Sequence, residues 1–476
     1  MKKTALVYGN FNILHPGHLR LLKFAKDSSD YLIVAVNSDE LTKNLDLLDE
    51  KTRLESIKAT SFVDEAFIIN EDIINYIKKV KPSIIVKGKE HEQKENLEEE
   101  TLKEYGGKLL FTSGEIGFSS LDLLHKDFQS SNSFIHHSIN YLSRHKIDKY
   151  QLESFVNKFS ELNVLVIGDT IIDEYITCDP VGMSQEDPTI VVTPLSNNKF
   201  IGGAAIVASH AKTLGAKVSY ISVVGDDDNY NYTKEYLKEL DINTKLYKDS
   251  TRPTTLKQRF RAHNKTLLRV NHLKQHYINK DFEKSILKKI KQLKKLDLII
   301  FSDFSYGVLT KKLIEKISCF AHEKNISMVA DSQSSSQVGD ISKFKDMDIV
   351  TPTEREIRLS INDFESGLVV LSKKLHKKSN PKYIFTTLGS EGIMIFNSNK
   401  NALLTDNIPA LNNNAKDVSG AGDSLITCSS MAKAVGANIW QSAYLGSLAA
   451  AIQVSRIGNI PIKKDEVLNE IRKINE

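Results

Sequence analysis

The stretch TALVYGNFNILHPGHLRLLKFA (Thr4–Ala25) predicts a strand, a turn and a helix in succession. Thr4–Tyr8 is a short apolar run that ends at Gly9, as a buried strand does, and Leu19–Ala25 has the spacing of an amphipathic helix. A second apolar run, Tyr31–Val36, follows the helix. Because strands that alternate with helices form βαβ units, we expect a parallel sheet.

This alternation continues to about residue 126 and resumes in a second, larger α/β region. The polar segment FQSSNSFIHHS separates the two, so we assign residues 1–126 to a first domain, 127–161 to a linker and a helix, and 162–476 to a second domain. In the second domain, Cys178–Pro194 and Thr254–Val270 alternate apolar and polar residues without a helical period. They predict antiparallel strands outside the main sheet, which we interpret as a lid.

Length and composition exclude several classes of protein. The chain has 476 residues, and its 64 Lys and Arg nearly balance its 60 Asp and Glu, so the charge does not suggest nucleic-acid binding. No apolar run approaches the ~18 residues that cross a bilayer, so we expect no membrane partner. The three cysteines form no CxxC pair and no signal-peptide core precedes Gly9, which favours a cytoplasmic protein. The lysine-rich stretch Lys284–Lys295 is typical of a solvated helix face.

Two histidines, His15 and His18, lie three residues apart where the first helix is expected to begin. Residues with this spacing share one face, so both imidazoles can point into a pocket where the helix start already favours anions. Such donors stabilise the charge that develops when a phosphate oxygen attacks the α-phosphorus of a nucleoside triphosphate. A lone histidine would more often be an ordinary surface or core residue, but the strand, glycine turn and helix around this pair indicate nucleotidyl transfer.

The turn matches a family signature, G-x-F-D-x-x-H-x-G-H, with Asn12 in place of the usual Asp. Residues 1–126 therefore resemble the cytidylyltransferase-like nucleotidyltransferases, a resemblance that implies a Rossmann-like α/β domain with His15 and His18 as catalytic residues. NSDELTK, KGKEHE and GFSSLDLL resemble further segments of that family. The resemblance assigns nucleotide and phosphate binding, from ATP or CTP, to Gly9, Asn10, Phe11, Gly17, Lys43, Arg53, Lys87, Gly88, Ser119 and Ser120. Taken singly, the lysine, the arginine and the serines would equally be solvated surface residues.

Near the far end of the chain, DVSGAGD (Asp417–Asp423) opens a predicted helix with small residues. Gly420, Ala421 and Gly422 let backbone N–H groups approach a phosphate closely, and the helix start adds a favourable potential. Asp423 can take the proton of an alcohol that attacks a γ-phosphate held by those groups. In isolation, the same residues would be equally consistent with an ordinary helix cap.

The segment from about Leu162 onward resembles the ribokinase-like, or PfkB, sugar kinases, whose signature is D-T-x-G-A-G-D. The resemblance implies a ribokinase-like α/β domain with a small β lid, an anion hole at Gly420, Ala421 and Gly422, and Asp423 as catalytic base. GDTIID, IGGAA and TLGSEG match further motifs. By resemblance, sugar binding falls to Asp169, Asp173, Gly202 and Gly203, and ATP binding to Thr387, Gly389 and Gly392.

Three positions depart from the kinase motifs. Ile206 occupies a usual Asn position, and Tyr306 a position where Lys is common. Thr353 replaces the Asn of the N-x-x-E segment, in which Glu356 would hold a water on Mg²⁺. Threonine can still hydrogen-bond such a water, so we expect weaker or shifted magnesium binding rather than its loss.

The predicted lid segment TLKQRFRAHNKTLLRVN carries Arg259, Arg261 and Arg269. Two of them share one face of a strand, and arginine forms bidentate contacts with phosphate, so a clamp on a substrate phosphate is one interpretation. A solvated edge that prevents aggregation is the other.

A sugar kinase joined to a nucleotidyltransferase can make a sugar 1-phosphate and then a nucleotide sugar. The pairing resembles the bifunctional enzymes of ADP-heptose synthesis, which phosphorylate heptose 7-phosphate at C1 and then transfer AMP from ATP, although in their common form the kinase comes first. Two alternatives stay open: a CTP-dependent transferase for another sugar or polyol phosphate, and a kinase-like module that only binds sugar. We also expect a homodimer, because apolar lid residues such as Ile190, Val191 and Val192 would favour a covered edge.

Overall fold

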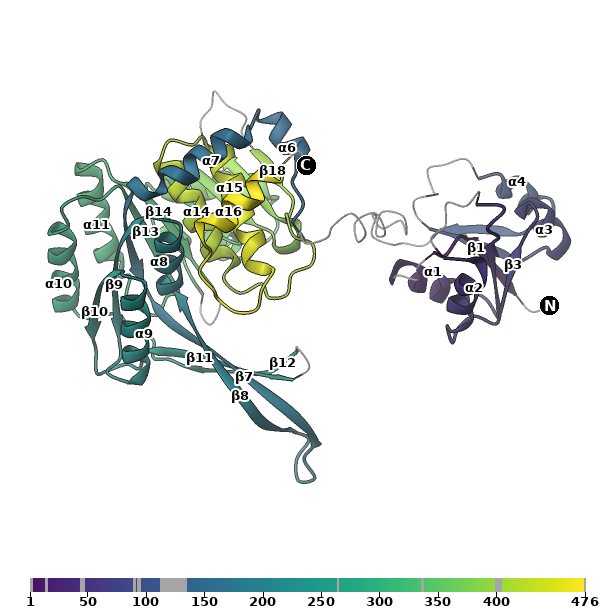
Figure 1. Cartoon of the computed structure of the whole chain (residues 1–476), viewed down its shortest axis with the longest axis horizontal. Helices are drawn as coiled ribbons and strands as arrows, with labels where there is room; N and C mark the ends of the chain where they lie inside the picture. Colours follow the sequence, from purple (N-terminus) through teal and green to yellow (C-terminus); the bar gives the residue numbers. More distant parts are fainter. Residues whose placement is uncertain are drawn as a thin grey trace. The chain divides into compact units, whose positions relative to one another are not determined.

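The computed structural model describes residues 3–12, 16–42, 48–88, 91, 96–111, 135–262, 265–334, 338–398 and 405–474, without the side chains of residues 16, 17 and 20. The chain divides into two compact units, Met1–Ser133 and Phe134–Glu476 (Figure 1). Each unit has its own sheet and its own hydrophobic core.

The first unit is a parallel five-stranded sheet in the order β3-β2-β1-β4-β5. Alternate residues of each strand face opposite sides, as strand geometry requires. Ala5 and Val7 pack with Leu22 and Ile57 on one side, and Leu6 packs with residues of the opposite helices on the other. The Rossmann-like prediction is confirmed. The strands are β1 (Thr4–Gly9), β2 (Tyr31–Asn37), β3 (Glu65–Ile69), β4 (Ile84–Lys87) and β5 (Lys108–Phe111), and the helices are α1 (Pro16–Asp27), α2 (Glu50–Lys58), α3 (Ile73–Val80) and α4 (Glu98–Lys103).

The second unit is built on a nine-stranded sheet in the order β10-β9-β6-β13-β14-β15-β16-β17-β18. Pairing is parallel from β10 to β16, and β17 and β18 add antiparallel strands at one edge. The strands are β6 (Asn163–Gly168), β9 (Lys217–Val224), β10 (Asn243–Lys248), β13 (Leu298–Asp303), β14 (Ser327–Ser332), β15 (Ile349–Val350), β16 (Tyr383–Thr387), β17 (Ile393–Asn397) and β18 (Thr405–Ile408).

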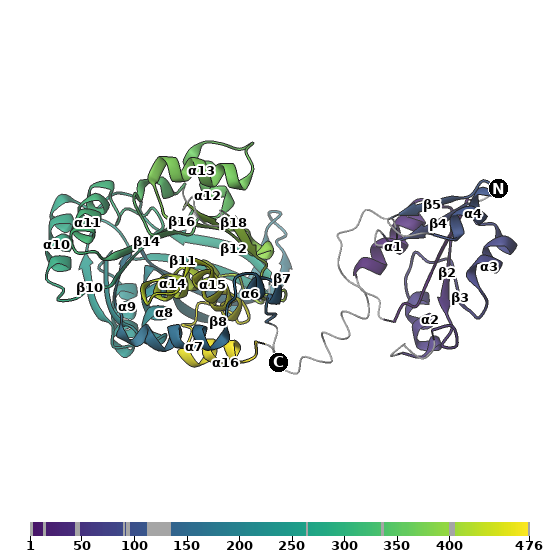
Figure 2. The ribbon, with the colours of Figure 1, turned by 90° about the horizontal axis from the view of Figure 1, so that it is seen from above.

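Helices cover both faces of this sheet, because successive strand residues are apolar on both sides. Figure 2 shows α12 and α13 on one side and α14, α15, α8 and α7 on the other. One face carries α6 (Ile139–Arg144), α7 (Lys149–Lys158), α8 (Ala204–Thr213), α9 (Asp228–Glu239), α14 (Ala421–Ala434), α15 (Ile439–Val454) and α16 (Lys464–Arg472). The other carries α10 (Lys280–Lys291), α11 (Lys311–Glu323), α12 (Glu354–Ile361) and α13 (Leu368–Ser379).

Helices α6 and α7 lie in the segment that we assigned to a linker and a helix, and they pack into the core of the second unit. Tyr141, Leu142, Leu152 and Val156 are buried there. Among the described helices, none combines the length and apolar character needed to cross a bilayer.

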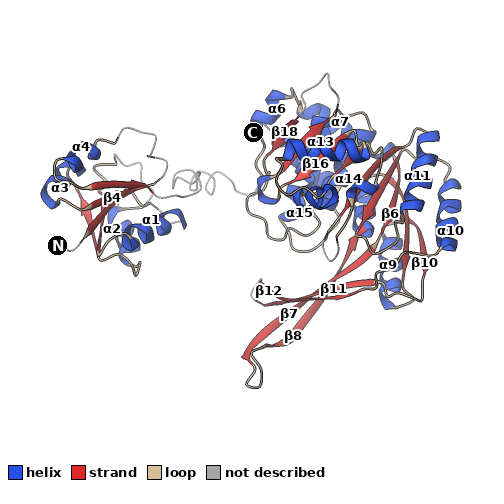
Figure 3. Cartoon of the chain, turned by 180° about the vertical axis from the view of Figure 1, so that it is seen from behind, coloured by secondary structure: helices blue, strands red, loops and turns tan. Residues whose placement is uncertain are grey.

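A separate four-stranded sheet, β12-β11-β7-β8, forms the lid, as the sequence predicts. Its strands are β7 (Thr170–Met183), β8 (Ile190–Gly203), β11 (Thr255–Ala262) and β12 (Lys265–His272), and the long β7–β8 arm extends from the unit in Figure 3. Both hairpins are antiparallel, while β11 and β7 pair in parallel. The lid strands begin earlier than the predicted Cys178, because Thr170–Ile176 is buried and shows no alternation.

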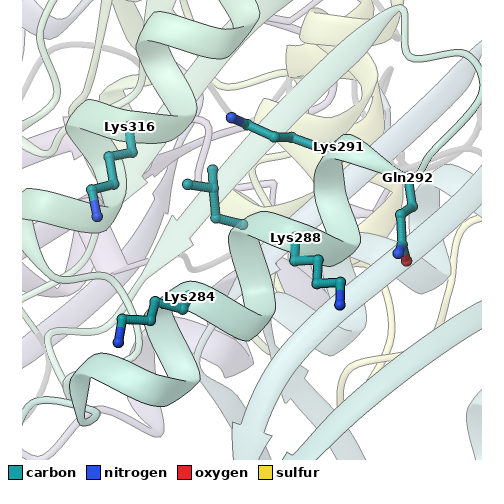
Figure 4. Close-up of a pocket in the computed structure, with 6 residues that line it drawn as sticks. Lys284, Lys288, Lys291, Gln292 and Lys316 are labelled. Carbon is teal, nitrogen blue, oxygen red and sulfur yellow. The ribbon is translucent and has the colours of Figure 1, made fainter.

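The lysine-rich stretch lies on α10, where Lys284, Lys288 and Lys291 are exposed, as expected. Together with Lys316 of α11 they border a shallow depression (Figure 4). None of the predicted site residues lines this depression. The stretch is therefore the solvated outer face of the helix.

Candidate active sites

In the first unit, the predicted phosphate turn follows β1, at the sheet centre. Phe11 is buried with a left-handed φ of 51°, and its ring meets that of His18 edge-on, with centroids 5.2 Å apart. His18 lies in the first turn of α1, so its imidazole stands where the helix N–H groups favour an anion. Of the other predicted residues, His15, Lys43, Ser119 and Ser120 lie outside the described residues.

Arg53 is fully buried in the first unit. Its guanidinium donates to the carbonyls of Leu48 (3.0 Å) and Asn10 (2.7 Å) and to the Asp39 carboxylate (2.6 Å). These bonds join the turn after β1 to the loop after β2, which fixes the position of the phosphate turn. A contact of Arg53 with a triphosphate stays a prediction.

Lys87, at the end of β4, forms an ion pair with Glu98, which was not predicted from the sequence. Its ammonium lies 3.1 Å from Glu98 and 5.4 Å from the ring centroid of Tyr8, which also donates to Glu98. Gly88 follows directly. This cluster stands at the carboxyl ends of β1 and β4, where ligands bind in sheets of this topology.

In the second unit, the DVSGAGD turn leads into α14. Gly420 has a φ of 79°, and a Cβ at this position would lie 2.3 Å from the Asn459 side chain, so glycine is required. A Cβ on Gly422 would meet nothing within 4 Å, which leaves open space in front of the turn. The Gly422 N–H, in the first helical turn, can therefore be reached by a phosphate, and the Ala421 N–H makes only a long bond, 3.4 Å, to the Val418 carbonyl.

Asp423 is buried in that first turn, where Gln333 donates to it at 3.3 Å. Burial, with repulsion from Asp173, raises its pKa to about 7, although Lys257 and the bond from Gln333 oppose the shift. A carboxylate with a pKa near neutrality is suited to accept a proton from an alcohol and release it again.

A second buried carboxylate, Asp331, shares the amide of Gln333, which donates to it at 3.1 Å. Burial and the charges of Glu356 and Asp423 raise the pKa of Asp331. A cation brought close to these carboxylates would relieve their repulsion.

Glu356 and Thr353 form a capping box at the start of α12. The two Glu356 oxygens accept from the backbone N–H groups of Thr353 (2.8 Å) and Ser334 (2.6 Å). Within the described ranges, no group of three or more His, Cys, Asp or Glu is placed to hold a metal ion. A contact of Glu356 with a water on Mg²⁺ stays a prediction.

Asp173 is one of the residues that the resemblance assigns to sugar binding. Its carboxylate lies 3.3 Å from Arg259 and 3.4 Å from the Asn459 amide. A Cβ on Gly202 would lie 2.5 Å from it, and one on Gly203 would lie 2.3 Å from the Asp169 carbonyl. The two glycines therefore let β8 approach β7 where Asp173 faces the turn of α14.

Asp169 has a different environment. It accepts from the backbone N–H groups of Phe304 (2.9 Å), Tyr306 (3.3 Å) and Val308 (3.3 Å). Burial and the charge of Asp303 raise the Asp169 pKa to about 6. In the structure this carboxylate holds the FSDFSYG loop, and its contact with a sugar stays a prediction.

Arg259 and Arg261, two of the predicted lid arginines, both lie close to the aromatic ring of Tyr175. The guanidinium carbons of Arg259 and Arg261 lie 5.0 and 5.2 Å from the centroid of Tyr175. Arg259 also donates to Ser419 at 3.3 Å, and its side chain is only 14% exposed. For Arg259 the solvated-edge interpretation is therefore wrong.

The TLGSEG turn lies beside α12, where Thr387 pairs with Thr353 in an isolated bridge. Gly389 and Gly392 have φ values of 62° and 91°, and a Cβ on Gly392 would lie 2.1 Å from the Ile408 carbonyl. These glycines permit the tight turn at the end of β16, and their contact with ATP stays a prediction.

A model of the pfkB family of carbohydrate kinases matches residues 161–465, which is more than half of the chain. The chain belongs to this family. A cytidylyltransferase-like model matches residues 6–112, so this region precedes the pfkB region.

Curated relatives of this pfkB-family chain include the "Bifunctional protein HldE" of Aliarcobacter butzleri, 33% identical over 313 residues, which are 64% of this chain and 63% of that protein. The protein of the same name from Geotalea uraniireducens is 28% identical over 68% of this chain and 66% of its own length. The matches thus span slightly less than two thirds of the relatives' length.

Solved structures show the same fold as the pfkB unit. Phosphofructokinase-2 from Escherichia coli, in complex with substrates and products, superposes with a TM-score of 0.54 at 14% identity over 66% of this chain and 99% of its own. Ribokinase from Thermotoga maritima gives 0.52 at 21% identity over 66% and 99%.

Several residues around Asp423 and Asp173 were not predicted from the sequence. Lys257, on β11, is buried, and its ammonium lies 5.1 and 5.5 Å from the ring centroids of Phe304 and Tyr306. Its spacing was a usable signal, since Lys257, Arg259 and Arg261 alternate along one predicted lid strand and therefore share a face. For Gln333 and Asn459, no pattern in the sequence points to the site.

Proposed function

We propose that the chain phosphorylates a sugar phosphate in its second unit and transfers a nucleotidyl group to the product in its first. The observation that carries the proposal is the position of Asp423, buried in the first turn of α14 beside a glycine turn with open space. A mere scaffold has no need of a carboxylate whose pKa is raised to about 7.

In the kinase step, the sugar hydroxyl gives its proton to Asp423 while its oxygen bonds to the γ-phosphorus of ATP and ADP leaves. Backbone N–H groups at Ala421 and Gly422 stabilise the charge on the transferred phosphoryl group. Glu356 would hold a water on the Mg²⁺ that accompanies ATP, and such an ion would neutralise phosphate charge. Lys257 and Arg259 supply positive charge on the sugar side.

In the transferase step, an oxygen of the sugar 1-phosphate attacks the α-phosphorus of the nucleotide, and pyrophosphate leaves. His18 and the start of α1 stabilise the developing charge, together with His15 as the resemblance implies. Arg53 keeps the turn that carries these groups in place through its bond to Asn10.

The kinase substrate we propose is heptose 7-phosphate. After a separate phosphatase removes the 7-phosphate of the product, AMP transfer from ATP to the remaining heptose 1-phosphate gives ADP-heptose for a cell-surface glycan such as lipopolysaccharide or capsule. Support comes from the similarity to the HldE proteins and from Arg259 and Arg261, which can hold the substrate's own phosphate. A CTP-dependent transferase for another sugar phosphate is the alternative, because the described residues around Lys87 do not distinguish the bases.

We further propose that the enzyme acts in the cytoplasm as a homodimer whose lids cover each other. The support is a set of apolar lid side chains that lie in solvent. They are Val181, Met183, Ile190, Val191, Leu195, Leu267 and Leu268.

The products identify the function. Purified protein is incubated with Mg²⁺, ATP or CTP, and a panel of sugar phosphates, and the products are analysed by mass spectrometry. We expect ADP and heptose 1,7-bisphosphate from heptose 7-phosphate and ATP, and pyrophosphate and ADP-heptose from heptose 1-phosphate and ATP. If heptose yields neither ADP from its 7-phosphate nor pyrophosphate from its 1-phosphate, the heptose assignment is refuted.

A further inference from the structure

The loop after α15 forms a wall of the kinase site. Its residue Asn459 is 7% exposed, and its Nδ2 lies 3.4 Å from the Asp173 carboxylate. The Asn459 Oδ1 is buried and accepts no hydrogen bond, and a Cβ on Gly420 would lie only 2.3 Å from it. The Asn459 amide therefore lies between the Asp173 carboxylate, which is expected to bind the sugar, and the predicted phosphate turn at Gly420.

The backbone beside Asn459 is held firmly. The Gly458 N–H donates to Asp417 at 3.0 Å, and the Gly458 carbonyl accepts from Gln453 at 2.9 Å. Gly458 has a φ of 80°, and a Cβ there would lie 2.6 Å from the ring of Phe200. The amide is thus oriented before any ligand arrives.

A buried carbonyl oxygen without a hydrogen-bond donor is destabilising, so such groups call for an explanation. A sugar hydroxyl is the donor that this position suits, since the neighbouring groups are a carboxylate and a phosphate turn. Ile206, at the position of the amide residue in the kinase motif, has no polar side-chain atom and is fully buried in the core. It cannot accept a hydrogen bond from a sugar hydroxyl.

We propose that Asn459 is a sugar-binding and specificity-determining residue. Its Oδ1 accepts a hydrogen bond from a hydroxyl next to the one that is phosphorylated, and its Nδ2 orients Asp173. Proximity to Gly420 places this hydroxyl close to the transferred phosphate; for phosphorylation at C1 it is the hydroxyl at C2. The inference rests on the proposed kinase function.

The test compares wild type and Asn459→Ala on heptose 7-phosphate and its 2-deoxy analogue, or on the matching pair for whichever sugar of the panel is phosphorylated. We expect wild type to lose about five- to hundredfold in kcat/KM on the deoxy sugar, the range that one unsatisfied buried polar group corresponds to. Asn459→Ala should be weaker on the full sugar, with an unchanged KM for ATP, and should hardly distinguish the two sugars.

Asn412→Ala is the matched control. Asn412 is also 7% exposed and donates to the Ala451 carbonyl, so its loss should lower Tm but leave sugar discrimination intact. Full discrimination by Asn459→Ala would overturn the proposal, as would an equal rise in both KM values. If wild type phosphorylates no sugar, the proposed function fails and this inference with it, whereas the first two outcomes overturn only the inference.

Discussion

Tyr175, on lid strand β7, donates a 2.8 Å hydrogen bond to Asp417, the first residue of the DVSGAGD turn. Arg259, on the adjacent strand β11, donates to the Tyr175 hydroxyl and to Ser419. The lid is therefore bonded directly to the turn that is expected to hold the phosphate. A sugar that contacts the lid can therefore influence the position of the predicted anion hole through Tyr175 and Arg259.

Tyr175→Phe removes this connection and keeps the ring between the two arginines. We expect kcat for sugar phosphorylation to fall about three- to tenfold, the effect of one lost hydrogen bond. Tyr232→Phe is the control, because Tyr232 donates to the Lys199 carbonyl and not to the turn. Equal kcat values for the two variants would contradict a role of Tyr175 in positioning the turn.

The pH dependence of sugar phosphorylation should report Asp423. The ionised form is the base, and burial raises the pKa of Asp423 to about 7. We therefore expect kcat/KM to fall about tenfold per pH unit below that pKa and to level off above it. Initial rates between pH 5 and about 9 check this, and a rate that stays constant down to about pH 5 would exclude Asp423 as the titrating base.

The same shift has a consequence for stability. The folded pKa of Asp423 is raised from 3.8 to about 7, so between these values the folded state binds the proton more tightly and loses stability as pH rises. Asparagine at position 423 does not titrate, so the Asp423→Asn variant lacks this loss of stability. Asp423→Asn should therefore have a higher Tm of the second unit than wild type at pH 8, with a difference that shrinks towards pH 4, as thermal unfolding at several pH values can show. A difference that grows towards pH 4 would contradict the assignment.

Arg53→Met should destabilise the first unit by about 2 kcal/mol, because it removes three hydrogen bonds made by a fully buried guanidinium, one of them to the Asp39 carboxylate. Transferase activity should fall as well, since the turn after β1 loses its bond from Arg53 at Asn10. Lys58→Met, on the exposed face of the same helix, is the control and should change neither property. Denaturant unfolding and a pyrophosphate-release assay measure the two effects; an Arg53→Met variant as stable as Lys58→Met would refute the bracing role.

The features that the sequence could predict are local. The strand, glycine turn and helix at Gly9–His18 and the small residues at Gly420–Gly422 lie in one continuous stretch each, so short-range rules apply to them. The lid strands could be recognised but not delimited, because Thr170–Ile176 is buried on both faces and reads as a continuous apolar run. The short edge strands β10 and β18 were missed for lack of a pattern.

The features that escaped prediction arise from tertiary contact. Asn459 reaches Asp173 across a separation of 286 residues, and nothing in the sequence pairs them. Arg53 could have been placed inside, since it shares the buried face of α2 with Ile57, four positions on. The solvated-surface alternative for Arg53 is wrong, because the side chain is fully buried, and its predicted contact with a triphosphate stays a prediction.

The most direct test of the two-site proposal compares wild type, Asp423→Asn and His18→Ala. Each protein is incubated with ATP and Mg²⁺ and with either heptose 7-phosphate or heptose 1-phosphate, and the products are analysed by mass spectrometry. Wild type should make heptose 1,7-bisphosphate from the 7-phosphate and ADP-heptose from the 1-phosphate. Asp423→Asn should lose only phosphorylation, and His18→Ala only nucleotidyl transfer. Loss of both activities in either variant would contradict independent sites.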